Sequence, residues 1–80
     1  MNKHGYNLKK IKQLRELNSL LLTDMAQLLN ITLAGYSKKE NGERKFTISE
    51  AKVLSELFGL PIEVIFFNDK SNQNVNTSIS

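Results

Sequence analysis

The chain has no cysteine and no tryptophan, and it holds only one histidine and one proline among its 80 residues. The absence of cysteine excludes a disulfide framework, a thiolate zinc ligand and a thiol nucleophile in this chain. The single histidine, His4, has no second ligand at metal-binding spacing, so we expect no metal site. A phosphate-cradling glycine loop and a strand-borne nucleophile are missing as well. We therefore expect neither an enzyme nor a bound cofactor.

Long apolar runs are also missing. No uninterrupted stretch approaches the roughly 18 apolar residues that a membrane helix needs, and no signal-peptide core follows the start. With 40% hydrophobic and 24% charged residues, the composition is that of a globular chain. We expect a soluble, cytoplasmic protein that makes no contact with a membrane. Its one small domain buries only about 60% of the surface that the unfolded chain exposes.

Charge is unevenly distributed along the chain. The formal net charge is +3, and the first 17 residues hold five basic groups against one acidic group. A second basic cluster follows in the middle of the chain: Lys38, Lys39, Arg44 and Lys45. From residue 47 onward, two basic groups face four acidic ones. A basic part joined to an acidic part favours a polyanion on one face, although ordinary solvated helix faces give the same pattern.

Apolar spacing and capping residues predict an all-α chain with five short helices. Apolar residues recur at helical spacing, beginning with the stripe Leu8, Ile11, Leu14 and Leu17, and no strand alternation occurs. Good caps flank several segments, among them Thr32 and the capping box of Thr47 with Glu50. The predicted helices cover residues 8–17, 22–29, 33–40, 48–58 and 62–67. We assign residues 1–7 to an N-terminal arm, 8–68 to the helical domain and 69–80 to a disordered polar tail.

The second and third predicted helices are joined by only three residues, Asn30, Ile31 and Thr32. So short a turn forces a steep crossing and projects the second helix of the pair outward, as in helix-turn-helix DNA-binding proteins. A generic helical hairpin shows the same features. The geometry alone therefore leaves DNA binding and simple packing equally open.

Four segments resemble the phage-repressor/Cro family of helix-turn-helix proteins, the XRE type. They are IKQLRE at 11–16, MAQLLNIT at 25–32, YSKKENGERK at 36–45 and LFGLPIEVIFF at 57–67. The resemblance implies the compact five-helix fold of lambda repressor, with the helix-turn-helix at the second and third helices. It also implies a small, sequence-specific transcriptional regulator, a repressor of a phage, plasmid or mobile element. Such a protein binds double-stranded DNA as a homodimer and acts by occupying its operator.

The resemblance also assigns roles to individual residues. In that family the third helix lies in the major groove, with residues at its start and one turn later at base edges. On this sequence the implied base-reading residues are Leu33, Ala34, Ser37 and Lys38. The implied phosphate contacts are Leu22, Thr23, Thr32, Lys39, Asn41, Arg44 and Lys45. Combined with the charge pattern, the resemblance predicts a partly buried ion pair between Arg15 and Glu40.

The sequence departs from the family pattern in two places, the starts of the second and third helices. The polar pair that usually opens the second helix is replaced by Leu21 and Leu22, and the third helix begins with Leu33 and Ala34. Leucine and alanine offer a base edge only apolar contact with a thymine methyl group. Because the leucines at 20–22 cannot all face inward, at least one of them is expected to be exposed. This keeps a second function open: a helix-turn-helix module that binds another regulator or enzyme through Leu21 and Leu22.

The last predicted helix carries more apolar surface than so small a core needs. We expect a two-fold dimer in which the same patch of each subunit meets its counterpart. The predicted contact residues are Ile62, Ile65, Phe66 and Phe67. Since adjacent helix residues point about 100° apart, one of the two phenylalanines is expected to be exposed.

Overall fold

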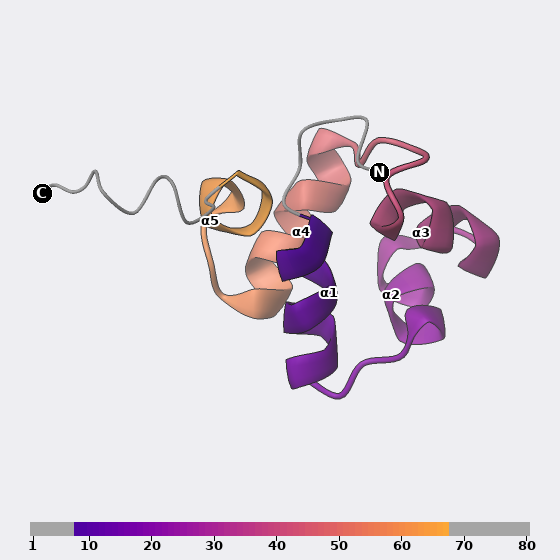
Figure 1. Cartoon of the computed structure of the whole chain (residues 1–80), viewed down its shortest axis with the longest axis horizontal. Helices are drawn as coiled ribbons and strands as arrows, with labels where there is room; N and C mark the ends of the chain where they lie inside the picture. Colours follow the sequence, from indigo (N-terminus) through magenta and orange to yellow (C-terminus); the bar gives the residue numbers. More distant parts are fainter. Residues whose placement is uncertain (1–7, 68–80) are drawn as a thin grey trace, which may run out of the picture.

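The computed structural model describes residues 8–67, which form five helices and, within that range, no strand (Figure 1). The helices are α1 (Leu8–Leu17), α2 (Leu22–Leu29), α3 (Leu33–Glu40), α4 (Ile48–Phe58) and α5 (Ile62–Phe66). None of them is long and apolar enough to cross a membrane. The predicted all-α class is confirmed, and α5 ends one residue earlier than expected. The predicted arm at 1–7 and tail at 69–80 lie outside the described residues.

Capping side chains set the starts of α3 and α4. The Gly35 amide donates a hydrogen bond to Thr32 Oγ1 at 2.9 Å. At α4 the Glu50 amide donates to Thr47 Oγ1 at 3.1 Å, and the Thr47 amide donates to Glu50 Oε1 at 2.8 Å. Both arrangements satisfy first-turn amides that have no partner within the helix. These are the caps that the sequence predicted.

Asn30 closes α2 and Leu21 precedes its first residue. Asn30 closes the helix in the left-handed conformation at φ 59°, which asparagine tolerates better than most residues. At the start, the N-cap is Leu21, whose side chain has no acceptor. The Asp24 carboxylate instead accepts a hydrogen bond from the Leu21 amide at 2.7 Å. Leu21 therefore precedes the first helical residue, Leu22, where the sequence analysis begins the second helix.

The core lies where α1, α4 and α5 meet the helix-turn-helix pair (Figure 1). Its aromatic centre is Phe46, from the loop before α4. The ring centroid of Phe46 lies 6.2 Å from that of Tyr36 and 5.3 Å from that of Phe66, both in edge-to-face geometry. Buried aliphatic residues complete the core: Ile11, Met25, Ala26, Leu29, Ala51, Leu54 and Ile65. α3 and α5 therefore share one core, through Tyr36 and Phe66 on either side of Phe46.

α5 corrects part of the predicted dimer surface. Ile65 is fully buried and Phe66 is only 2% exposed, so neither side chain is available to a second subunit. With five residues, α5 packs against both α1 and α4, and that inward face takes these two side chains. Ile62 is half-buried and Phe67 is 52% exposed. These two remain as candidate contact residues.

α1 corrects the predicted apolar stripe at its last residue, because Leu17 is 79% exposed. Three residues fall short of a full helical turn by about 60°, so a strict three-residue spacing drifts around the helix. Leu17 consequently points about 180° away from Leu8. Arg15, four residues after the buried Ile11, shares its inward face instead.

Candidate nucleic-acid interface

α3 has one buried face and one exposed face. Its buried residues are Gly35, Tyr36, Lys39 and Glu40. Leu33, Ala34 and Lys38 are exposed, and Ser37 is half-exposed. These four positions fall within about 140° around the helix axis. The structure therefore brings the four predicted base-reading residues to one surface.

Gly35 allows a close approach at the first turn of α3. A Cβ atom at this position would lie 3.0 Å from Thr32 Oγ1 and 3.8 Å from Arg44 Nη1. Glycine therefore leaves room for the capping hydroxyl and for the guanidinium group beside it. Thr32 and Arg44, both predicted phosphate contacts, thus lie together at the N-terminal end of α3, where the helix dipole favours an anion.

The other predicted phosphate contacts surround α3. Thr23, Asn41 and Lys45 are exposed, and Leu22 is half-buried. A shallow hollow between α1, α2 and α3 is lined by Leu8, Lys9, Lys12, Arg15, Leu22, Ser37, Glu40 and Asn41. The sequence analysis gave Lys9 and Lys12 no role, because spacing within α1 does not show which of its faces borders α3. The structure adds both lysines to the cations beside the candidate interface.

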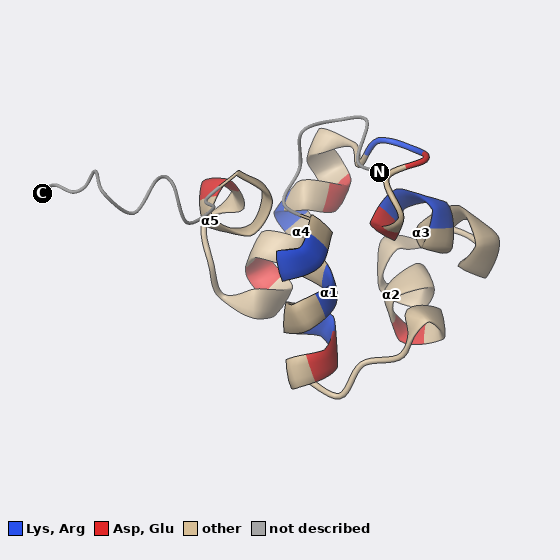
Figure 2. Cartoon of the chain, in the orientation of Figure 1, with Lys and Arg blue, Asp and Glu red and all other residues tan. Residues whose placement is uncertain are grey.

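Basic residues outnumber acidic ones on α1 and on α3, whereas acidic residues outnumber basic ones on α4 and α5 (Figure 2). Arg44 and Lys45 add two basic residues against Glu43 in the loop after α3, while α4 carries Glu50 and Glu56 against Lys52. Within residues 8–67 no three histidine, cysteine, aspartate or glutamate side chains lie close enough together to hold a metal ion. The charge pattern suits an anionic partner on the α3 side of the molecule.

Lys39 does not belong to this surface, contrary to the prediction. Its side chain is buried, and Nζ donates hydrogen bonds to Glu50 Oε1 at 2.7 Å and to the Lys45 carbonyl at 3.0 Å. An ammonium group held in this way cannot reach a phosphate. The Lys39 side chain has a structural role. It links α3 to the start of α4 and holds the backbone at Lys45, in the loop between the two helices.

Glu50 is the partner that balances Lys39. Burial alone would raise the pKa of this carboxyl group, but the hydrogen bonds from the Lys39 ammonium and the Thr47 amide outweigh it. The pKa of Glu50 is therefore held below its ordinary value. One carboxylate thus serves the capping box of α4 and a buried ion pair to α3.

Arg15 and Glu40, the pair predicted to link the first and third helices, are in direct contact. Arg15 Nε donates to Glu40 Oε2 at 3.0 Å and Nη2 donates to Oε1 at 3.2 Å, a bidentate arrangement. The Tyr36 hydroxyl also donates to Glu40 Oε2, at 2.7 Å, and Arg15 Nη1 donates to the Leu20 carbonyl at 2.9 Å. This cluster holds three parts of the chain together: α1, α3, and the segment that contains Leu20 and precedes α2.

The two proton donors of this cluster keep their protons. Burial and the hydrogen bond to Glu40 both raise the pKa of Tyr36 above its ordinary value. The hydrogen bond to Glu40 also raises the pKa of Arg15, against the opposing effect of burial. The whole Tyr36 side chain is buried, including its hydroxyl group.

Two helices that cross at a three-residue turn, with the second one exposed beside a basic loop, define a helix-turn-helix DNA-binding domain. The sequence profile of the helix-turn-helix family matches residues 11–65, more than half of the chain. The chain belongs to this family, in its XRE type, and is a DNA-binding helix-turn-helix regulator. No curated protein matches it.

Proposed function

We propose that the protein is a sequence-specific transcriptional repressor of a phage, plasmid or other mobile element, and that it acts by occupying its operator. Each subunit sets α3 in the major groove of one half-site, and the bound dimer blocks polymerase. The observation that supports this most is the division of α3 into two faces. Leu33, Ala34, Ser37 and Lys38 share the outer face, while buried ion pairs to α1 and α4 hold the inner one.

Phosphate contacts account for most of the attraction to DNA. Thr32 and Arg44 are placed for the phosphate at the N-terminal end of α3, with Asn41 and Lys45 following in the loop. Leu22 has no polar side-chain atom, so it can offer a phosphate only its backbone amide at the first turn of α2. The Lys45 carbonyl already accepts a hydrogen bond from Lys39, which fixes the backbone from which the exposed Lys45 ammonium extends.

We expect the affinity for duplex DNA to fall by about 0.9 log units per log unit of salt for each phosphate neutralised. Lys45→Ala keeps the carbonyl bond to Lys39, so it should weaken binding to all duplexes alike and lower that slope by about one. Lys52→Ala, which removes an exposed lysine of α4, is the matched control and should leave the slope unchanged. Fluorescence anisotropy against a pool of genomic fragments at several salt concentrations measures these slopes. If no duplex binds below about 10 µM at about 50 mM salt, the repressor function is wrong.

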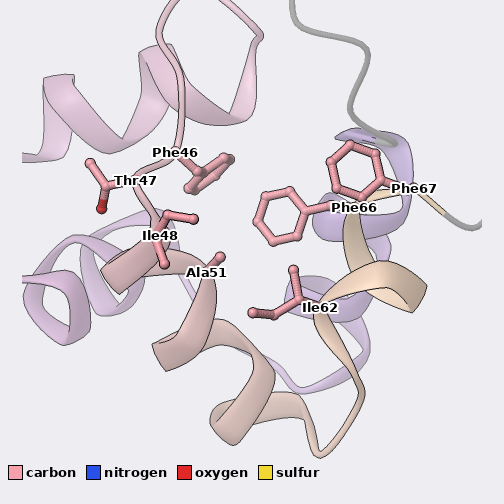
Figure 3. Close-up of a pocket in the computed structure, with 7 residues that line it drawn as sticks. All are labelled: Phe46, Thr47, Ile48, Ala51, Ile62, Phe66 and Phe67. Carbon is pink, nitrogen blue, oxygen red and sulfur yellow. The ribbon is translucent and has the colours of Figure 1, made fainter.

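The homodimer is proposed to form along the edge between α4 and α5. A shallow apolar pocket lies there, lined by Phe46, Thr47, Ile48, Ala51, Ile62, Phe66 and Phe67 (Figure 3). Ile48 is 79% exposed and Phe67 is 52% exposed, so two large apolar side chains flank the pocket. In a two-fold arrangement each subunit supplies both the pocket and the projecting side chains, and the patch is therefore self-complementary.

Phe67→Asp should dissociate this dimer into the 9.1 kDa monomer, because it places a charge in an apolar contact. Analytical ultracentrifugation at micromolar concentration measures the change in mass. Leu17→Asp, at an apolar residue of α1 that is even more exposed than Phe67, is the control and should leave the dimer intact. Circular dichroism verifies that both variants fold. A wild-type protein that sediments only as the monomer would exclude the dimer.

A second candidate function is favoured by the leucines that open the helix-turn-helix. Leu21 is 65% exposed and Leu22 is half-buried beside the hollow next to α1. Through these residues the domain could bind another regulator or enzyme instead of reading DNA. The salt dependence separates the two functions, since an apolar protein contact persists at salt concentrations that abolish phosphate binding.

A further inference from the structure

We propose that the first turn of α3 recognises the C5 methyl groups of thymine, so that the DNA sites bound by this protein carry thymine opposite Leu33 and Ala34. The inference rests on the proposed function, because it requires α3 to lie in the major groove. It adds the chemical class of base that the groove-facing helix selects.

Three of the five polar side chains of α3 are used inside the protein. Tyr36 donates its hydroxyl proton to Glu40, Glu40 accepts from Arg15, and Lys39 binds Glu50. Adenine is read by asparagine or glutamine and guanine by arginine or lysine, and of these α3 offers the groove only Lys38. On its outer face only the Ser37 hydroxyl and the Lys38 ammonium remain, and both lie one turn beyond the start.

The first turn presents apolar groups to the groove. Leu33 is 47% exposed and Ala34 is exposed. Ile31, two residues before Leu33, packs against the hydrophobic core, whereas Leu33 does not. The hydrogen bond from the Gly35 amide to Thr32 and the buried ion pairs of Lys39 and Glu40 fix the helix, so Leu33 stays at the surface.

Only one kind of group on the major-groove edge of DNA is apolar, the thymine methyl. A leucine pressed against O6 and N7 of guanine, or against N6 of adenine, removes their water and returns no hydrogen bond. Leu33 therefore selects thymine in two ways, by burying the methyl group and by penalising the polar edges. Ala34 is smaller and supports the same preference at the adjoining position.

The test uses duplexes that differ only in methyl groups. A duplex enriched from a random library by the wild-type protein is resynthesised with deoxyuridine in place of thymidine at one position at a time. Uracil keeps the hydrogen-bonding edge of thymine and lacks only the methyl. At positions facing α3 we expect about a fourfold loss of affinity per methyl, the equivalent of about 0.8 kcal/mol. Thymines elsewhere in the duplex should show no difference.

Two controls assign the effect to Leu33. Leu33→Ala, which shortens the apolar side chain, should reduce the difference between thymine and uracil at the position that residue 33 faces, while Leu17→Ala, at a more exposed leucine of α1, should preserve it. At the same position 5-methylcytosine should bind about fourfold better than cytosine. The inference is overturned, with DNA binding intact, if uracil and thymine bind equally throughout or if Leu33→Ala retains the full difference. If no duplex is enriched at all, both the inference and the proposed function are wrong.

Discussion

Replacing Glu40 by glutamine is expected to lower the free energy of unfolding by about 3–5 kcal/mol, because the buried Arg15 guanidinium loses its counter-charge. A domain of this length has roughly 4–12 kcal/mol in total, at about 0.05–0.15 kcal/mol per residue. The Glu40→Gln variant should therefore be close to its unfolding threshold at room temperature. Urea denaturation followed by circular dichroism measures the loss.

Two further variants show which interaction accounts for that loss. Tyr36→Phe removes only the hydroxyl bond to Glu40 and should cost about 1.5–3 kcal/mol, the usual value for a hydrogen bond to a charged group. The double variant Arg15→Met, Glu40→Leu removes both charges and should recover most of the stability. A loss below about 1 kcal/mol in Glu40→Gln would mean that the pair contributes no more than an exposed one.

Replacing Lys39 by methionine is expected to cost about 3 kcal/mol, because Glu50 remains buried without its ammonium partner. The value lies at the low end for a buried pair since the Thr47 amide still donates to Glu50. Lys38→Met is the matched control. It removes the adjacent, exposed lysine and should change the stability by no more than about 0.5 kcal/mol.

The loss in Lys39→Met should also depend on pH. The pKa of Glu50 is lowered in the folded protein, so the stability that its ionised form provides is present above the ordinary glutamate pKa of about 4.3. That stability disappears as the pH falls through the lowered folded-state pKa, because a protonated Glu50 no longer needs Lys39. The difference between wild type and Lys39→Met should therefore stay constant above about pH 4.3 and shrink as the pH falls below it, through the lowered folded-state pKa of Glu50. Urea denaturation above and below this pH measures it, and a difference that stays constant throughout would show that the pair is not ionic.

The helix ends were predictable because each depends on groups close together in the sequence. Thr32 caps an amide three residues away, and Thr47 and Glu50 cap each other across the same distance. Asn30 needs only its own backbone preference to close α2. Such local chemistry is contained in a short stretch of sequence, and the predicted helices accordingly match the observed ones to within a residue.

The faces of the helices were less predictable, because they depend on where distant helices pack. Lys38 and Lys39 are neighbours that point about 100° apart, and only the position of α4 decides which of them is buried. Glu50 has the pattern of a capping residue, and its second partner comes from 11 residues earlier in the chain. In the same way, the sequence does not show which of the neighbours Phe66 and Phe67 is buried; the packing of α5 decides it. Arg15 and Glu40 are 25 residues apart in the sequence, so no local spacing indicates that they meet. Their contact was predicted from the resemblance to the family combined with the charge pattern.

The two faces of α3 also bear on how such a domain changes over generations. The inner face holds the side chains on which folding depends, and the outer face holds Leu33, Ala34, Ser37 and Lys38. Mutations on the outer face leave the buried ion pairs and the aromatic core untouched, so natural selection can act on binding preference almost independently of folding. A duplicated gene could thus diverge toward a new DNA target by a few point mutations while inheriting the same scaffold.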